Sequence, residues 1–84
     1  MKGIKHSKNF GAYYYDPDKN QTMLIADEVN IEILREKLEK EIDLQGLPKK
    51  EGACLINIRD KYNDVVVEYR YVNGELVRKK QIWV

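Results

Sequence analysis

Few side chains in this sequence are of the types that act as nucleophile or base. His6 is the only histidine and Cys54 the only cysteine, and Ser7 and Thr22 are the hydroxyl candidates. Neighbouring side chains of an extended chain point to opposite sides, so His6 and Ser7 are poorly placed to act as a pair. We expect Cys54 to face the core, where a thiol is inert. A Cys54–His6 pair formed by the fold is the alternative, but the spacing does not argue for it. The sequence predicts a protein that is not an enzyme.

Metal and cofactor sites also lack the residues they need. One histidine and one cysteine cannot form a zinc site without carboxylate ligands. Asp16, Asp18 and Asn20 resemble the start of a calcium loop, but the glycine and glutamate of such a loop are missing at the required offsets. The five glycines are scattered and form no phosphate-binding run. We therefore expect no metal and no cofactor.

Aromatic and basic side chains are the remaining candidates for binding. Tyr13, Tyr14 and Tyr15 are consecutive, so in a strand at least one large ring lies on the face away from the core. Such a ring can cover neighbouring strands, contact a protein or stack on a base. Three cations in a row follow Val77 near the end of the sequence. A nucleic-acid surface would use Tyr13, Tyr15, Arg70, Arg78, Lys79, Lys80 and Trp83.

Length and composition restrict the class of protein. The sequence has 84 residues, 43% of them hydrophobic and 35% charged, which is typical of one globular domain spanning 1–84. The net charge is +1, with an acidic middle and basic flanks. The single cysteine forms no internal disulfide, and the first ten residues lack the apolar core of a secretion signal, so we expect a cytoplasmic protein. No apolar run approaches the ~18 residues of a membrane span.

The first half of the sequence predicts a hairpin followed by a helix. Two strand-like runs, 10–15 and 22–26, flank an Asp-Pro-Asp-Lys-Asn turn in which Asp16 can accept backbone hydrogen bonds. Between residues 27 and 43 the apolar spacing changes to three and four, which predicts an amphipathic helix with Asp27 or Asn30 as its N-cap. The stripe consists of Ile31, Leu34, Leu38 and Ile42, and Ile33 lies off it. Alternatively, Val29, Ile31 and Ile33 continue the strand and the helix begins later.

The second half predicts a three-stranded meander. The runs 53–62, 65–72 and 75–84 are separated by Asn63-Asp64 and by Asn73-Gly74, which is a strong signal for a two-residue hairpin. If both loops have two residues, the register pairs Tyr62 with Val65, Ile58 with Tyr69, Ile56 with Tyr71, Tyr71 with Leu76 and Val65 with Ile82.

This register separates the residues of the meander into two faces. The apolar face holds Cys54, Ile56, Ile58, Tyr62, Val65, Val67, Tyr69, Tyr71, Leu76, Ile82 and Val84. The outer face holds Asn57, Arg59, Lys61, Glu68, Arg70, Glu75, Lys79 and Gln81, together with Leu55, Val66, Val72, Val77 and Trp83. Asp60, Arg78 and Lys80 fall on the apolar face, which indicates either a wet sheet edge or a bulge in the last strand.

Together these elements predict an α+β fold of two layers, with an antiparallel sheet of about five strands packed on one helix in the order ββαβββ. The outer face carries more apolar side chains than a solvent-exposed sheet face normally has. The last strand is expected at or near an edge of the sheet. We therefore expect a non-enzymatic binding module that contacts protein, either as a homodimer or with an accessory or inhibitor-type partner. Its contact residues would be Leu55, Val66, Arg70, Val72, Val77, Lys79 and Trp83. A small nucleic-acid-binding domain is the alternative, although Glu68 and Glu75 among the cations favour a solvated face.

Overall fold

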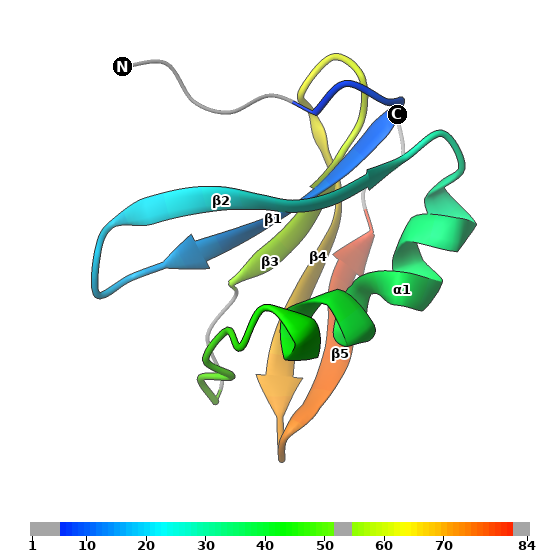
Figure 1. The fold of residues 1–84 in the computed structure, drawn as a ribbon. Coiled ribbons are helices and arrows are strands. Elements are labelled where there is room, and N and C mark those ends of the chain that lie inside the picture. The colour runs from blue at the N-terminus through cyan, green and yellow to red at the C-terminus, as the bar shows by residue number, and fades with distance from the viewer. Residues whose placement is uncertain (1–5, 52–54, 82–84) are drawn as a thin grey trace.

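The structure, a computed structural model, describes residues 6–51 and 55–81, with only the backbone of residues 79–81. The elements in chain order are β1 (Phe10–Asp16), β2 (Gln21–Glu28), α1 (Ile31–Leu44), β3 (Ile56–Arg59), β4 (Val65–Val72) and β5 (Glu75–Gln81). The strands form one antiparallel sheet in the order β2-β1-β3-β4-β5. Figure 1 shows α1 lying across one face of this sheet. The predicted α+β class and the order ββαβββ are confirmed.

The first hairpin has the turn that the sequence predicts between β1 and β2. One carboxylate oxygen of Asp16 accepts hydrogen bonds from the backbone N–H groups of Asp18, at 3.0 Å, and Lys19, at 3.4 Å. Asn20 completes the turn with a φ of 52°, a conformation that asparagine tolerates well. β2 then continues to Glu28, two residues beyond the predicted strand, and pairs with β1 as far as Phe10.

The helix begins at Ile31, the first residue of the predicted apolar stripe, and the alternative N-cap Asp27 is wrong because it lies in β2. Asn30 is the N-cap, and its side-chain oxygen accepts hydrogen bonds from the N–H groups of Glu32, at 2.7 Å, and Ile33, at 3.4 Å. The prediction of an N-cap at Asn30 is thus confirmed. The alternative in which Ile31 and Ile33 continue the strand is wrong, because the helix starts at Ile31. At the other end Gly46, with a φ of 65°, terminates the helix.

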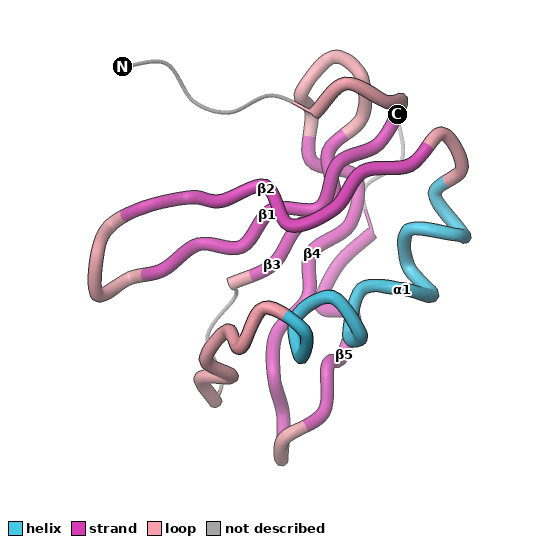
Figure 2. Tube along the Cα trace, in the orientation of Figure 1, coloured by secondary structure: helices cyan, strands magenta, loops and turns pink. Residues whose placement is uncertain are grey.

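The core lies between α1 and the face of the sheet that the helix covers. Leu34, Leu38 and Ile42 are fully buried along the predicted stripe, whereas Ile33 lies off it and is 49% exposed. They pack against buried side chains of the helix side of the sheet, namely Ala12, Tyr14, Ile56, Ile58, Val67, Tyr69 and Tyr71. The tube view in Figure 2 shows α1 covering this side while the opposite side of the sheet has no helix among the described residues. We call that opposite side the outer face.

The register of the meander corrects one prediction and confirms another. The Asn73-Gly74 hairpin forms as predicted, with positive φ at both residues and Tyr71 opposite Leu76. Across the other turn, Ile56 lies opposite Tyr69 and Ile58 lies opposite Val67. The predicted pairs, Ile56 with Tyr71 and Ile58 with Tyr69, are therefore wrong.

The longer β3–β4 loop explains the error. β3 already ends at Arg59, and the Asp60 carboxylate accepts hydrogen bonds from the N–H groups of Tyr62, at 2.9 Å, and Asp64, at 3.0 Å. Residues 60–64 therefore form the connection, and Tyr62 is 74% exposed in it instead of facing the core. The partners change by an even number of residues, so the faces of Ile56 and Ile58 are preserved.

Candidate protein-contact surface

β5 lies at one edge of the sheet. Among the described strands, β4 is its only neighbour. Val72 and Glu75 flank the two-residue hairpin, and such a flanking pair exchanges its backbone hydrogen bonds across the turn. Because bonding alternates along an antiparallel pair, the N–H and C=O groups of Leu76 and Arg78 then point away from β4. These outward groups are what an added strand would bind.

A bulge interrupts β5 near its end. Tyr69 lies opposite Arg78, but the next residue of β4, Glu68, lies opposite Lys80, so Lys79 is the extra residue. A bulge in the last strand is one of the two explanations that the sequence suggests for cations on the apolar face, and it is confirmed. The regular part of the edge consequently runs only from Glu75 to Arg78.

The outer face of β4 and β5 is partly apolar. Val66 and Val72 are half-buried there, Arg70 is exposed, and Val77 is 41% exposed. Leu55 was expected on the same face, and this placement is wrong: it lies just before β3, is only 4% exposed and packs into the core. Trp83 and Cys54 lie outside the described residues, as do Ile82 and Val84. For Lys79 and Lys80 only the positions in β5 are described.

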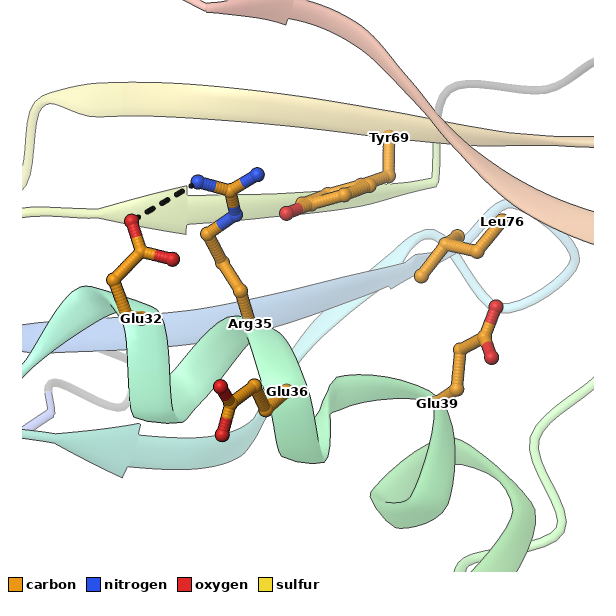
Figure 3. Close-up of a pocket in the computed structure, with 6 residues that line it drawn as sticks. All are labelled: Glu32, Arg35, Glu36, Glu39, Tyr69 and Leu76. Carbon is orange, nitrogen blue, oxygen red and sulfur yellow. Dashed lines mark hydrogen bonds and ion pairs between the residues drawn. The ribbon is translucent and has the colours of Figure 1, made fainter.

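A groove of about 310 Å³ lies on the helix side, between α1 and the last two strands. Figure 3 shows its lining, which consists of Glu32, Arg35, Glu36, Glu39, Tyr69 and Leu76. The guanidinium of Arg35 pairs with Glu32 at 3.3 Å. No described cation bonds to Glu36 or Glu39, and both are exposed. The groove therefore has a net negative charge beside an apolar floor.

Tyr71 is buried beneath the helix, and its pKa is affected by negative charge on the same helix. Its side chain is 1% exposed, and among the described side chains its hydroxyl is the one buried polar group without a hydrogen-bond partner. Burial, followed by the negative charges of Glu39 and Asp43, raises the pKa of Tyr71 to about 12. Of these two carboxylates Glu39 lines the groove, where it would stabilise an entering cation.

The three consecutive tyrosines, Tyr13 to Tyr15, do not form a platform on which several nucleic-acid bases could stack. Tyr14 points to the helix side and Tyr13 and Tyr15 to the outer face, which confirms that a ring lies away from the core. Tyr13, however, is 3% exposed, because Arg59 lies over its ring at 4.5 Å from the centroid and the His6 imidazole packs against it edge-on at 5.7 Å. Tyr15 is 37% exposed and donates a hydrogen bond to Asn20 at 2.7 Å. A nucleic-acid base therefore has access to Tyr15 but not to Tyr13.

His6 packs on the outer face of the sheet and anchors the start of the described chain there. Its Nε2 lies 2.8 Å from the carbonyl oxygen of Asp60, so this nitrogen is the donor, and its Nδ1 accepts from the Tyr13 hydroxyl at 2.7 Å. The imidazole lies over Gly11, where a Cβ would come within 2.6 Å of Nδ1. Ser7 bonds instead to the Asp27 carboxylate, at 3.2 Å from its hydroxyl. Both ring nitrogens of His6 are thus occupied by structural contacts.

The described residues contain no metal-binding group of three or more His, Cys, Asp or Glu side chains. Nor does any helix among them have the length and apolar character needed to cross a membrane.

Sequence reasoning missed the groove, although part of its signal was present. Glu32, Glu36 and Glu39 follow one another at spacings of four and three, which places them along one side of the helix. That side could have been recognised as acidic. What the spacing could not show is that Tyr69 and Leu76 lie opposite it.

Comparison of the chain with protein-family models, with curated proteins and with solved structures finds no match.

Proposed function

We propose that this protein is a non-enzymatic binding module that acts through protein–protein contact, by self-association or with an accessory or inhibitor-type partner. The contact surface combines the free edge of β5 with the outer face of β4 and β5. The observation that carries the proposal is Val77, which is 41% exposed on a strand whose other edge meets no described strand. An exposed apolar side chain beside unpaired backbone groups favours addition of another strand. The single cysteine favours action in the cytoplasm.

Nucleic-acid binding has less support. Of the two outward tyrosines, Tyr13 is covered, and the guanidinium that covers it, Arg59, also bonds to Asn57 and Asn63 at 3.2 Å. Several unpaired cations on one surface are needed to neutralise several phosphates. The acidic groove beside β5 would repel a phosphate backbone approaching the same edge.

The test is sedimentation velocity of the purified protein over a wide concentration range at ~50 to 500 mM salt, with and without a mixed short nucleic acid. We expect a reversible dimer whose dissociation constant depends much less steeply on salt than that of a nucleic-acid complex and does not change with nucleic acid, because most of the contact is backbone and apolar. A monomer that gains mass with nucleic acid at low salt and releases it at high salt would overturn the proposal in favour of nucleic-acid binding. A monomer under all conditions would overturn self-association.

A further inference from the structure

We infer that the partner at β5 is a second copy of this chain, paired antiparallel about Val77, with the Arg78 of each copy reaching the acidic groove of the other. This inference rests on the proposed function and adds the partner, the register and the charged contact. Three features must favour the same register of the two β5 strands: the backbone hydrogen bonds, the side-chain contacts and the charges.

The backbone restricts the register. Leu76 and Arg78 direct their N–H and C=O groups away from β4, as the hairpin alternation requires. A twofold axis at Val77 places Leu76 opposite the partner's Arg78, so both outward residues of both copies bond and the junction has about four hydrogen bonds. An axis at Leu76 or at Arg78 leaves half of these groups unused, because beyond them lie the hairpin turn and the Lys79 bulge.

The side chains agree with this register. On the outer face, Val77 meets the partner's Val77 as a non-hydrogen-bonded pair, in which side chains come closest. An axis at Arg78 would instead bring two arginines together on the helix side.

The groove provides the complementary charge. Leu76 and Glu39 line the same groove, and Figure 3 shows the Glu39 carboxylate beside Leu76. A guanidinium opposite Leu76 on the adjacent strand therefore extends toward Glu39. The twofold axis is perpendicular to the joined sheet, so both helices lie on one side and the contact forms twice. The Arg78 side chains then lie between two acidic helix faces that would otherwise repel each other.

The bulge gives the pairing a natural limit. Beyond Arg78 the extra residue Lys79 breaks the ladder, so only Glu75 to Arg78 can pair regularly. Pairing about a twofold axis also uses the β5 edge of both copies, so no third copy can add at β5.

Charge reversal tests the contact between Glu39 and Arg78. We expect Glu39→Arg and Arg78→Glu each to raise the dimer dissociation constant at least about tenfold in sedimentation velocity, since each places like charges together. The double variant should return it to within about threefold of the starting protein. Asp64→Arg is the matched control: it makes the same charge change in the β3–β4 loop, away from β5, and should leave the constant unchanged. All these positions are exposed, so the variants should fold.

Cross-linking tests the register independently. In a Cys54→Ser background, Val77→Cys should form a disulfide dimer on mild oxidation, because only a residue on the twofold axis faces itself. Glu75→Cys, on the same strand and face but off the axis, is the control and should remain largely uncross-linked. A dimer that neither cross-links through position 77 nor responds to charge reversal would overturn this inference and leave the proposed protein contact standing. A monomer at all concentrations would overturn this inference together with self-association, and contact with a different protein would be the form of the proposed function that remains.

Discussion

The guanidinium of Arg59 lies 4.5 Å from the centre of the Tyr13 ring, on the outer face of the sheet. The two residues come from β3 and β1, and the His6 imidazole packs edge-on against the same tyrosine. Together they convert an outward tyrosine into a buried one, 3% exposed. His6 is thereby part of the fold, and its contacts have measurable consequences.

The close approach of His6 to Gly11 predicts non-additive effects on stability. A methyl group at Gly11 would overlap the imidazole, so we expect Gly11→Ala to lower the free energy of unfolding by about 1–3 kcal/mol. In a His6→Ala background the same change should cost much less, because the space is free. Urea denaturation of the four proteins of this cycle measures the coupling. Purely additive effects would mean that His6 does not lie over Gly11 in solution.

Two buried tyrosines should respond in opposite ways to loss of the hydroxyl. Tyr14 donates a hydrogen bond to the carbonyl oxygen of Pro48 at 2.5 Å, so Tyr14→Phe should destabilise the protein by about 1 kcal/mol. The Tyr71 hydroxyl is buried without a partner, so Tyr71→Phe should be neutral or stabilising. Thermal and urea unfolding of both variants provide the comparison, and a clear loss of stability in Tyr71→Phe would show that its hydroxyl is bonded.

Tyr71 also predicts a specific sensitivity to alkaline pH. Burial, with Glu39 and Asp43 nearby, raises the pKa of Tyr71 from 10.0 to about 12 in the folded protein. Below pH 10 the hydroxyl is neutral in both the folded and the unfolded protein, so stability does not depend on its ionisation. Above pH 10 the unfolded protein ionises first, and the free energy of unfolding falls by up to about 1.4 kcal/mol per pH unit until the folded hydroxyl ionises at about pH 12. We expect the free energy of unfolding to fall more steeply in this window for the wild type than for Tyr71→Phe, and equal slopes would contradict the assignment.

The N-cap of α1 predicts a graded series of variants. The Asn30 side chain accepts two backbone hydrogen bonds that Ala cannot replace, so Asn30→Ala should cost about 1 kcal/mol of unfolding free energy. Asn30→Asp keeps the acceptor and places a negative charge at the helix N-terminus, so it should be neutral or stabilising. Circular dichroism during urea unfolding measures both, and an equal loss in the two variants would argue against capping.

An ion pair between β2 and α1 predicts how stability changes in acid. Lys37 donates to Glu28 at 2.6 Å, and this hydrogen bond lowers the pKa of Glu28 below its ordinary value of 4.5. The contribution is present above pH 4.5 and is lost as pH falls through the folded pKa. Glu28→Gln should therefore show a shallower decline of unfolding free energy in acid than the wild type. An unchanged acid profile would show that the pair is not maintained in solution.

Several elements follow from signals between residues that are close together in the sequence. The Asn73-Gly74 turn, the stripe of Leu34, Leu38 and Ile42, and the cap at Asn30 depend on a few neighbouring residues, and each appears in the structure as predicted. These are sufficient for the α+β class and for the order of the elements, because turn residues and hydrophobic periodicity act over short distances.

Other features depend on contacts between residues far apart in the chain, and these become visible when the chain is folded. Asp60 draws residues 60–64 into a loop and so moves Ile56 opposite Tyr69. The contacts around Tyr13 join residues 6 and 59, which no local pattern connects. The groove likewise needs α1 to lie beside Tyr69 and Leu76. Local patterns determine which face of a strand is apolar, but packing of distant segments determines which side chains remain open to a partner.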